Sequence, residues 1–165
     1  MTDANPDRRL VHEIDGRSAL QVYAAACGLR SVPKDAGVFA PFPLMIKVGG
    51  KYFARGTQRI YEDGSIEFAC AMEPGLVVTV ARPVDMLERL TGTFDTLSKA
   101  LGTPELVIGF DCAARTGDME RHGLSKAVSG LFEKHCVVGF STLGEQFNTI
   151  HVNNSFTCLG VAQGK

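Results

Sequence analysis

The 165-residue sequence lacks any surplus of basic residues: 17 Lys and Arg stand against 18 Asp and Glu, for a formal charge of −1. A chain without excess positive charge has little to attract a phosphate backbone or an anionic lipid surface. No apolar run approaches the roughly 18 residues of a membrane span, and residues 1–9 lack the apolar segment of a signal peptide. We therefore expect a cytoplasmic protein with neither nucleic acid nor membrane as a partner.

The sequence also lacks the cysteine spacing of a disulfide framework or a structural zinc site. Its five cysteines form no CxxC pair and are widely separated, at Cys27, Cys70, Cys112, Cys136 and Cys158. An odd number of isolated cysteines indicates reduced thiols. The motifs GxSxG and HExxH and a phosphate-binding loop are absent as well. We expect no metal, no other cofactor and no enzymatic activity.

What is present is enough apolar sequence for one core. Hydrophobic residues make up 45% of the chain and charged residues 21%, and the length is too short for two ordinary domains. We expect residues 10–165 to form a single domain. The polar residues 1–9 have little that packs, so they predict a flexible N-terminal arm.

The first half of the expected domain indicates one helix followed by hairpins. Residues 18–27 are rich in Ala and Leu and are followed by Gly28, a common helix stop. Glycine-containing turns then separate short apolar runs, which is typical of antiparallel strands. These runs cover residues 44–48, 66–72 and 76–80.

The second half indicates a strand–helix–strand crossover. After Pro83, apolar residues recur at spacings of three and four, which predicts an amphipathic helix. Residues 106–110 and 137–140 are short apolar runs, and residues 118–135 between them are helical in pattern. This order favours two parallel strands joined by a right-handed connection. The predicted class is α+β or mixed α/β, with a mostly antiparallel sheet, one parallel crossover and about three helices.

The crossover would bring two polar segments, residues 111–117 and 141–146, to one edge of the sheet. Open α/β sheets bind ligands at the carboxyl ends of their strands. Arg115 suits a carboxylate or phosphate, helped by free N–H groups at a helix start near Gly117 and Asp118. Glu145 suits an ammonium group. The candidate ligand-binding residues are Cys112, Arg115, Ser141, Glu145, Gln146, His151 and Asn153.

Each main candidate also fits a purely structural role. Arg115 equally suits a salt bridge at a helix start. Cys112 fits a small apolar filler after a buried strand better than a reactive thiol. Glu145 and Gln146 equally suit the end of a strand and the bonding of its turn. His135 fits a core or capping histidine near a helix end.

Four segments together resemble the C-terminal FIST domain, named for F-box and intracellular signal transduction proteins. Residues 137–146, VVGFSTLGEQ, and 151–157, HVNNSFT, resemble its closing glycine–aromatic–serine run, Gly-Glu pair and Asn-x-Thr strand, with Ser155 replacing the threonine. Residues 110–115, FDCAAR, are similar to its Phe-x-Cys-x-x-Arg segment, and residues 13–17, EIDGR, to its start.

The resemblance implies a sensory, ligand-binding role in signal transduction, with an amino acid or similar small polar metabolite as ligand. Some members of the family bind haem and report nitric oxide. The family usually carries an N-terminal FIST half before this region. That half, or a signalling output domain, is the expected protein partner.

Three functions remain open, in order of preference. The first is a non-enzymatic domain that binds a small polar ligand at the edge holding Arg115 and Glu145. The second is a haem sensor with His151 as an iron ligand. The third is an enzyme with Cys112 as nucleophile, His151 or His135 as base, and Glu145 as orienting partner.

Overall fold

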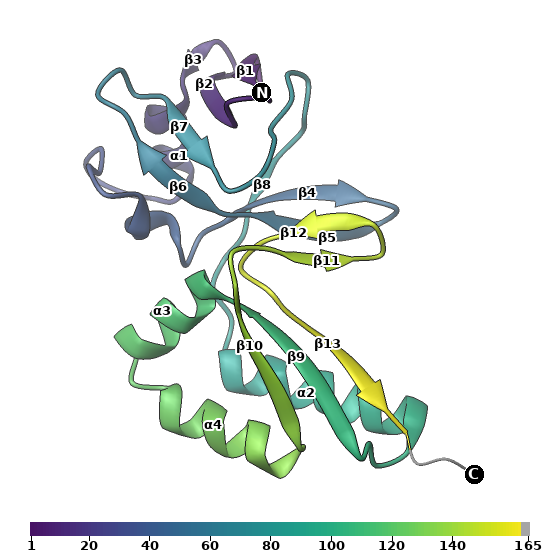
Figure 1. Ribbon diagram of the computed structural model, residues 1–165. Coiled ribbons are helices and arrows are strands. Elements are labelled where there is room, and N and C mark those ends of the chain that lie inside the picture. Colours follow the sequence, from purple (N-terminus) through teal and green to yellow (C-terminus); the bar gives the residue numbers. More distant parts are fainter. Residues whose placement is uncertain (163–165) are drawn as a thin grey trace. The chain divides into compact units, whose positions relative to one another are not determined.

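A computed structural model describes residues 1–162 of the chain (Figure 1). The chain divides into two compact units. Unit 1 comprises residues 1–83 and 149–154, and unit 2 comprises residues 84–148 and the stretch from 155 onward. The expected single domain over residues 10–165 stays a prediction, because two clusters of internal contacts do not by themselves show two independent domains.

The predicted fold class is confirmed. Residues 1–162 contain four α-helices, several antiparallel sheets and one mixed sheet. None of the helices in this part of the chain has the length and apolar character needed to cross a lipid bilayer.

Unit 1 packs short antiparallel strands against one helix. The helix α1 (Ala19–Ala26) is buried through Ala19, Leu20, Tyr23 and Ala24, and the Tyr23 ring stacks on Phe39 with ring centroids 4.0 Å apart. Phe39 ends the 3-10 helix η1 (Ala36–Phe39). One sheet holds β1 (Asp3–Asn5), β2 (Leu10–Ile14), β3 (Arg17–Ser18), β6 (Thr57–Ile60) and β7 (Ile66–Phe68). Another holds β4 (Leu44–Val48), β5 (Lys51–Arg55) and β8 (Thr79–Val80).

The predicted helix at residues 18–27 and strand at 44–48 are confirmed, whereas two predicted strands are shorter. The expected strand 66–72 ends as β7 at Phe68, and the expected strand 76–80 is reduced to β8. Between these two strands, Gly75 adopts a positive φ of 85°, which lies outside the extended region, and its N–H donates to the Met1 carbonyl at 2.9 Å.

Residues 1–9, expected from their polarity to form a flexible arm, include a short strand, and their flexibility stays a prediction. Strand β1 pairs antiparallel with β2. The Met1 ammonium group donates to the Leu76 carbonyl at 2.7 Å, and the Gly16 N–H donates to Thr2 Oγ1 at 2.8 Å. Main-chain groups, the terminal ammonium group and the Thr2 hydroxyl make these bonds, so the apolar content of the side chains does not reveal them.

Unit 2 contains the predicted parallel crossover. Strand β10 (Val137–Thr142) pairs parallel with β9 (Leu106–Cys112), which pairs antiparallel with β13 (Phe156–Val161) (Figure 1). Three helices supply the core around Val107: α2 (Met86–Leu101), α3 (Ala113–Arg121) and α4 (Ser125–Lys134). Two short strands follow β10 along the chain: β11 (Glu145–Phe147) in this unit and β12 (Ile150–Val152) in unit 1.

The predicted helix over residues 118–135 is two helices, and the first begins earlier. Gly123, with a φ of 67°, separates α3 from α4. Because α3 starts at Ala113, Gly117 and Asp118 lie inside it, and the expected anion site at a helix start there is wrong. The early start has a local cause: two alanines favour helix, and Arg115 bonds to Asp111 four residues before it.

Gly139→Ala should destabilise the protein by about 1–3 kcal/mol, the usual cost of overpacking. Gly139 lies opposite Gly109 in the parallel ladder, and an added Cβ would overlap the Gly109 carbonyl oxygen. Urea unfolding measures the effect. The matched control is Gly92→Ala in α2, where an added Cβ has nothing within 4 Å. That control should gain about 0.5–1 kcal/mol in the free energy of unfolding. Equal urea unfolding midpoints for the two variants would contradict this packing.

Candidate functional site

A buried ion pair lies where β9 ends and α3 begins. Arg115 Nε donates to Asp111 Oδ1 at 2.7 Å, and the two side chains are only 15% and 10% exposed. The second oxygen of the carboxylate, Oδ2, and the guanidinium nitrogen Nη2 are buried without a hydrogen-bond partner among the described residues. The pair therefore retains one unused acceptor and one unused donor.

The carboxyl group of Asp111 is in an unfavourable environment for its charge. Burial raises the pKa of Asp111, Arg115 opposes this rise, and the nearby Glu145 carboxylate adds to it. A positively charged or proton-donating group placed on Oδ2 would stabilise the ionised form.

A cavity of about 290 Å³ adjoins Asp111, whereas Arg115 lies behind this carboxylate and is not among the residues that line the cavity. Its polar lining comes from Asp111, Thr116 and Ser141, and the hydroxyl oxygens of Thr116 and Ser141 are 3.1 Å apart. Its apolar lining consists of Met119, Phe132, Val137, Phe140 and Phe156, with Gly109 and Gly139. A volume near 300 Å³ is at the lower end for ligand pockets, so the cavity suits a small molecule.

Glu145 lies at the same end of unit 2 as Arg115, as the crossover predicts. Both act on Asp111, Arg115 through the ion pair and Glu145 through its charge. Glu145 is 3% exposed, and its carboxylate accepts hydrogen bonds from the hydroxyls of Thr142 and Ser155. This arrangement favours the turn-bonding interpretation of Glu145. Its neighbour Gln146 is exposed.

His151 and Asn153 belong to unit 1, not to the unit that holds Arg115 and Glu145. Asn153 is fully buried, its Nδ2 lies 3.2 Å from His151 Nε2, and its Oδ1 accepts from the Gly56 N–H at 3.4 Å. Arg55, 8% exposed, donates to the His151 carbonyl at 2.8 Å. These contacts hold residues 149–154 against β5. Sequence reasoning missed Arg55, because one arginine at a strand end gives no sign that it is buried.

Cys112 and His135 lie at opposite ends of the parallel strand pair. Cys112 is 4% exposed and pairs with Thr142, the last residue of β10, whereas His135 precedes the first residue of β10. Five residues of strand separate the two ends by roughly 16 Å. The His135 ring stacks on Phe94 at 4.3 Å, which confirms the core interpretation. The proposed catalytic pairing of Cys112 with His135 is therefore wrong.

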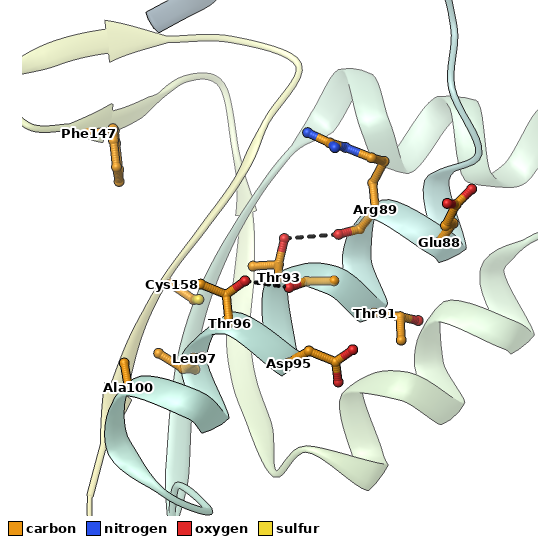
Figure 2. A pocket seen from close by; sticks show the side chains of 11 residues that line it. Glu88, Arg89, Thr91, Thr93, Asp95, Thr96, Leu97, Ala100, Phe147 and Cys158 are labelled. Atoms are coloured by element: carbon orange, nitrogen blue, oxygen red, sulfur yellow. Dashed lines mark hydrogen bonds between the residues drawn. The ribbon is translucent and has the colours of Figure 1, made fainter.

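A second, larger cavity of about 890 Å³ runs along α2 (Figure 2). Thr93 and Thr96 donate their hydroxyls to the carbonyls of Arg89 and Gly92, at 3.0 and 2.8 Å. The charged side chains that line it are exposed: Glu88, Arg89 and Asp95. It thus lacks a buried, unsatisfied charge to select a polar ligand. The sequence indicated α2 but gave no sign of this cavity.

Residues 1–162 contain no cluster of three or more His, Cys, Asp and Glu side chains arranged to hold a metal ion.

The five cysteines differ in exposure, from buried Cys70 and Cys112 to exposed Cys136. Burial raises the pKa of Cys27 to about 11 and also raises the pKa of Cys158. These two thiols are therefore protonated at neutral pH, which lowers their reactivity.

Comparison with known proteins gave a match to a protein family. The FIST C domain model matches residues 19–148, which is most of the chain. This range contains the 110–115 and 137–146 motifs and ends before residues 151–157. Neither the curated proteins nor the solved structures gave a match. Because the model covers most of the chain, the chain belongs to the FIST C domain family, a family of sensory domains in signal transduction.

Proposed function

We propose that this protein is a non-enzymatic sensory domain that binds an amino acid, or a similar small zwitterion, in the cavity beside Asp111. The supporting observation is the buried ion pair with one unused acceptor, Asp111 Oδ2, and one unused donor, Arg115 Nη2. Buried polar groups without partners cost about 1–3 kcal/mol each, more when charged. A ligand that supplies both partners recovers that cost.

A zwitterion matches these two groups by charge. Its ammonium group would donate to Asp111 Oδ2, and its carboxylate would accept from Arg115 Nη2. The hydroxyls of Thr116 and Ser141 offer further hydrogen bonds at the cavity wall. The aromatic and Met119 side chains around them suit an apolar portion of the ligand.

Among the other predicted ligand residues, Glu145 acts through Asp111 in this proposal. A bound ammonium group would offset the repulsion between the two carboxylates. The ligand-binding roles expected for Cys112, Gln146, His151 and Asn153 stay predictions. The haem-sensor alternative through His151 rests only on the family resemblance.

Signalling needs a ligand that binds one state of the protein better than another. Glu145 lies just before, and its partner Ser155 just after, the segment 149–154 that belongs to unit 1. We propose that occupancy beside Asp111 is reported through this Glu145–Ser155 contact to an N-terminal FIST half or an output domain.

Isothermal titration of the chain with the common amino acids tests the ligand class. One amino acid, or a chemically related group, should bind and raise the melting temperature, since a ligand of the folded state stabilises it. Thr116→Val should weaken this binding about tenfold, the effect of one lost hydrogen bond. Thr96→Val, which removes a hydroxyl from the α2 cavity, is the matched control and should bind normally. Silent titrations with unchanged melting would contradict the proposal.

A further inference from the structure

Strand β10 forms an open edge of the sheet in unit 2. The strand order is β10-β9-β13, so within residues 1–162 β10 has a single strand neighbour (Figure 1). Residues 138–141 are all exposed, including Gly139, whose exposed surface is main chain because it has no side chain. An open edge presents unpaired N–H and C=O groups to any strand that approaches.

This edge lacks the features by which proteins usually prevent strand pairing. Its sequence, VVGFST, contains no charge and no proline. Val138 is 53% exposed and Phe140 is 64% exposed, on the same face. The opposite edge, β13, is mostly half-buried, with α2 and β11 beside it, whereas β10 has α3 and α4 beside it but keeps residues 138–141 exposed. The unprotected edge is thus specific to β10.

The pattern of β10 is complementary to itself about Gly139. If two β10 strands pair antiparallel with Gly139 opposite Gly139, Val138 of each copy lies opposite Phe140 of the other. Aromatic and β-branched residues are favourable cross-strand partners. No charged side chain in either strand demands a partner of opposite charge. A second copy of this chain therefore fits the edge without any change of sequence.

We propose that two copies of this chain associate through antiparallel pairing of their β10 strands about a two-fold axis. Each copy contributes the same surface, as in other two-fold dimers. The pairing would extend the contact in which the Phe110 and Phe140 rings lie 5.4 Å apart, edge to face. Since a short strand buries less than a standard interface, the dimer should be weak and concentration-dependent. The inference does not depend on the proposed ligand.

Sedimentation equilibrium of the whole chain, from micromolar to millimolar concentration, tests the proposal. The mass should rise toward that of a dimer. Phe140→Lys places a charge on the edge and should weaken association at least tenfold, as should Val138→Lys, with circular dichroism confirming that both fold. Leu159→Lys is the matched control, because Leu159 is 61% exposed on the same face but lies on β13. It should still dimerise.

Hydrogen exchange provides the direct reading of the edge. The main-chain amides of residues 138–141 that point away from β9 should become protected as concentration rises. A wild-type monomer at all concentrations would overturn the proposal. So would a dimer without this protection, or equal loss of association in Leu159→Lys, which would indicate stacking of sheet faces. Protection that appears only with another protein present would assign the edge to that partner and would also overturn it.

Discussion

Arg115→Ala should lower the free energy of unfolding by about 3–5 kcal/mol at neutral pH, the usual result of removing one partner from a buried ion pair. The variant leaves Asp111, 7% exposed and close to Glu145, without its only cationic partner among the described residues. Urea unfolding measures the loss. Arg121→Ala, on the same helix, removes an ion pair to Asp118 in which the arginine is 53% exposed. That control should lose less than about 1 kcal/mol.

The loss in Arg115→Ala should depend on pH with a definite sign. The pKa of Asp111 is raised in the folded protein. The free energy of unfolding therefore falls as the pH rises from the pKa of Asp111 in the unfolded chain to its pKa in the folded protein. Removing Arg115 raises the folded pKa further and extends this window upward. The stability of the Arg115→Ala variant should therefore be closest to that of the wild type in acid, where Asp111 is protonated in both proteins. A loss that is independent of pH, or equal to that of Arg121→Ala, would contradict the buried pair.

Asp111→Asn should weaken the binding of the selected amino acid by about 10–100-fold, because a hydrogen bond to a charged group contributes about 1.5–3 kcal/mol. The asparagine preserves the shape of the side chain and an acceptor for Arg115 Nε, but it removes the negative charge that would attract an ammonium group. Isothermal titration of the folded variant measures the change. A ligand without an ammonium group should be affected much less.

Asp118→Asn is the matched control for this substitution. Asp118 lies on α3 but does not line the cavity, and its carboxylate bonds to Arg121 and lies 3.4 Å from His122. Asp118→Asn should bind the selected amino acid as tightly as the wild type does. If the two variants bind equally well, the ligand does not use Asp111.

The crossover of unit 2 was predictable because its signals are local. Two short apolar runs and an intervening helical pattern define β9, β10 and the helices between them, and connection rules then make the strands parallel. The shared position of Arg115 and Glu145 follows from that topology. Helix α2 was predictable from the spacing of Leu90, Phe94 and their neighbours, which form its buried face.

Features that depend on long-range contacts were not predictable. The sequence placed Asp111 only in the segment that follows a strand. Its burial could not be predicted, because it comes from residues on other strands and on α3. The transfer of residues 149–154 to unit 1 depends on Arg55 and Gly56, almost one hundred positions earlier. The sequence grouped the polar residues His151 to Asn154 with Glu145 and gave no sign that they belong to unit 1, and the ligand-binding roles of His151 and Asn153 stay predictions.

A crystal structure with the titrated amino acid bound tests most directly whether unit 2 recognises a zwitterion. We expect electron density in the 290 Å³ cavity, with the ammonium group on Asp111 Oδ2 and the carboxylate facing Arg115 Nη2. Density in the larger cavity along α2, with the cavity beside Asp111 left unfilled, would contradict the account.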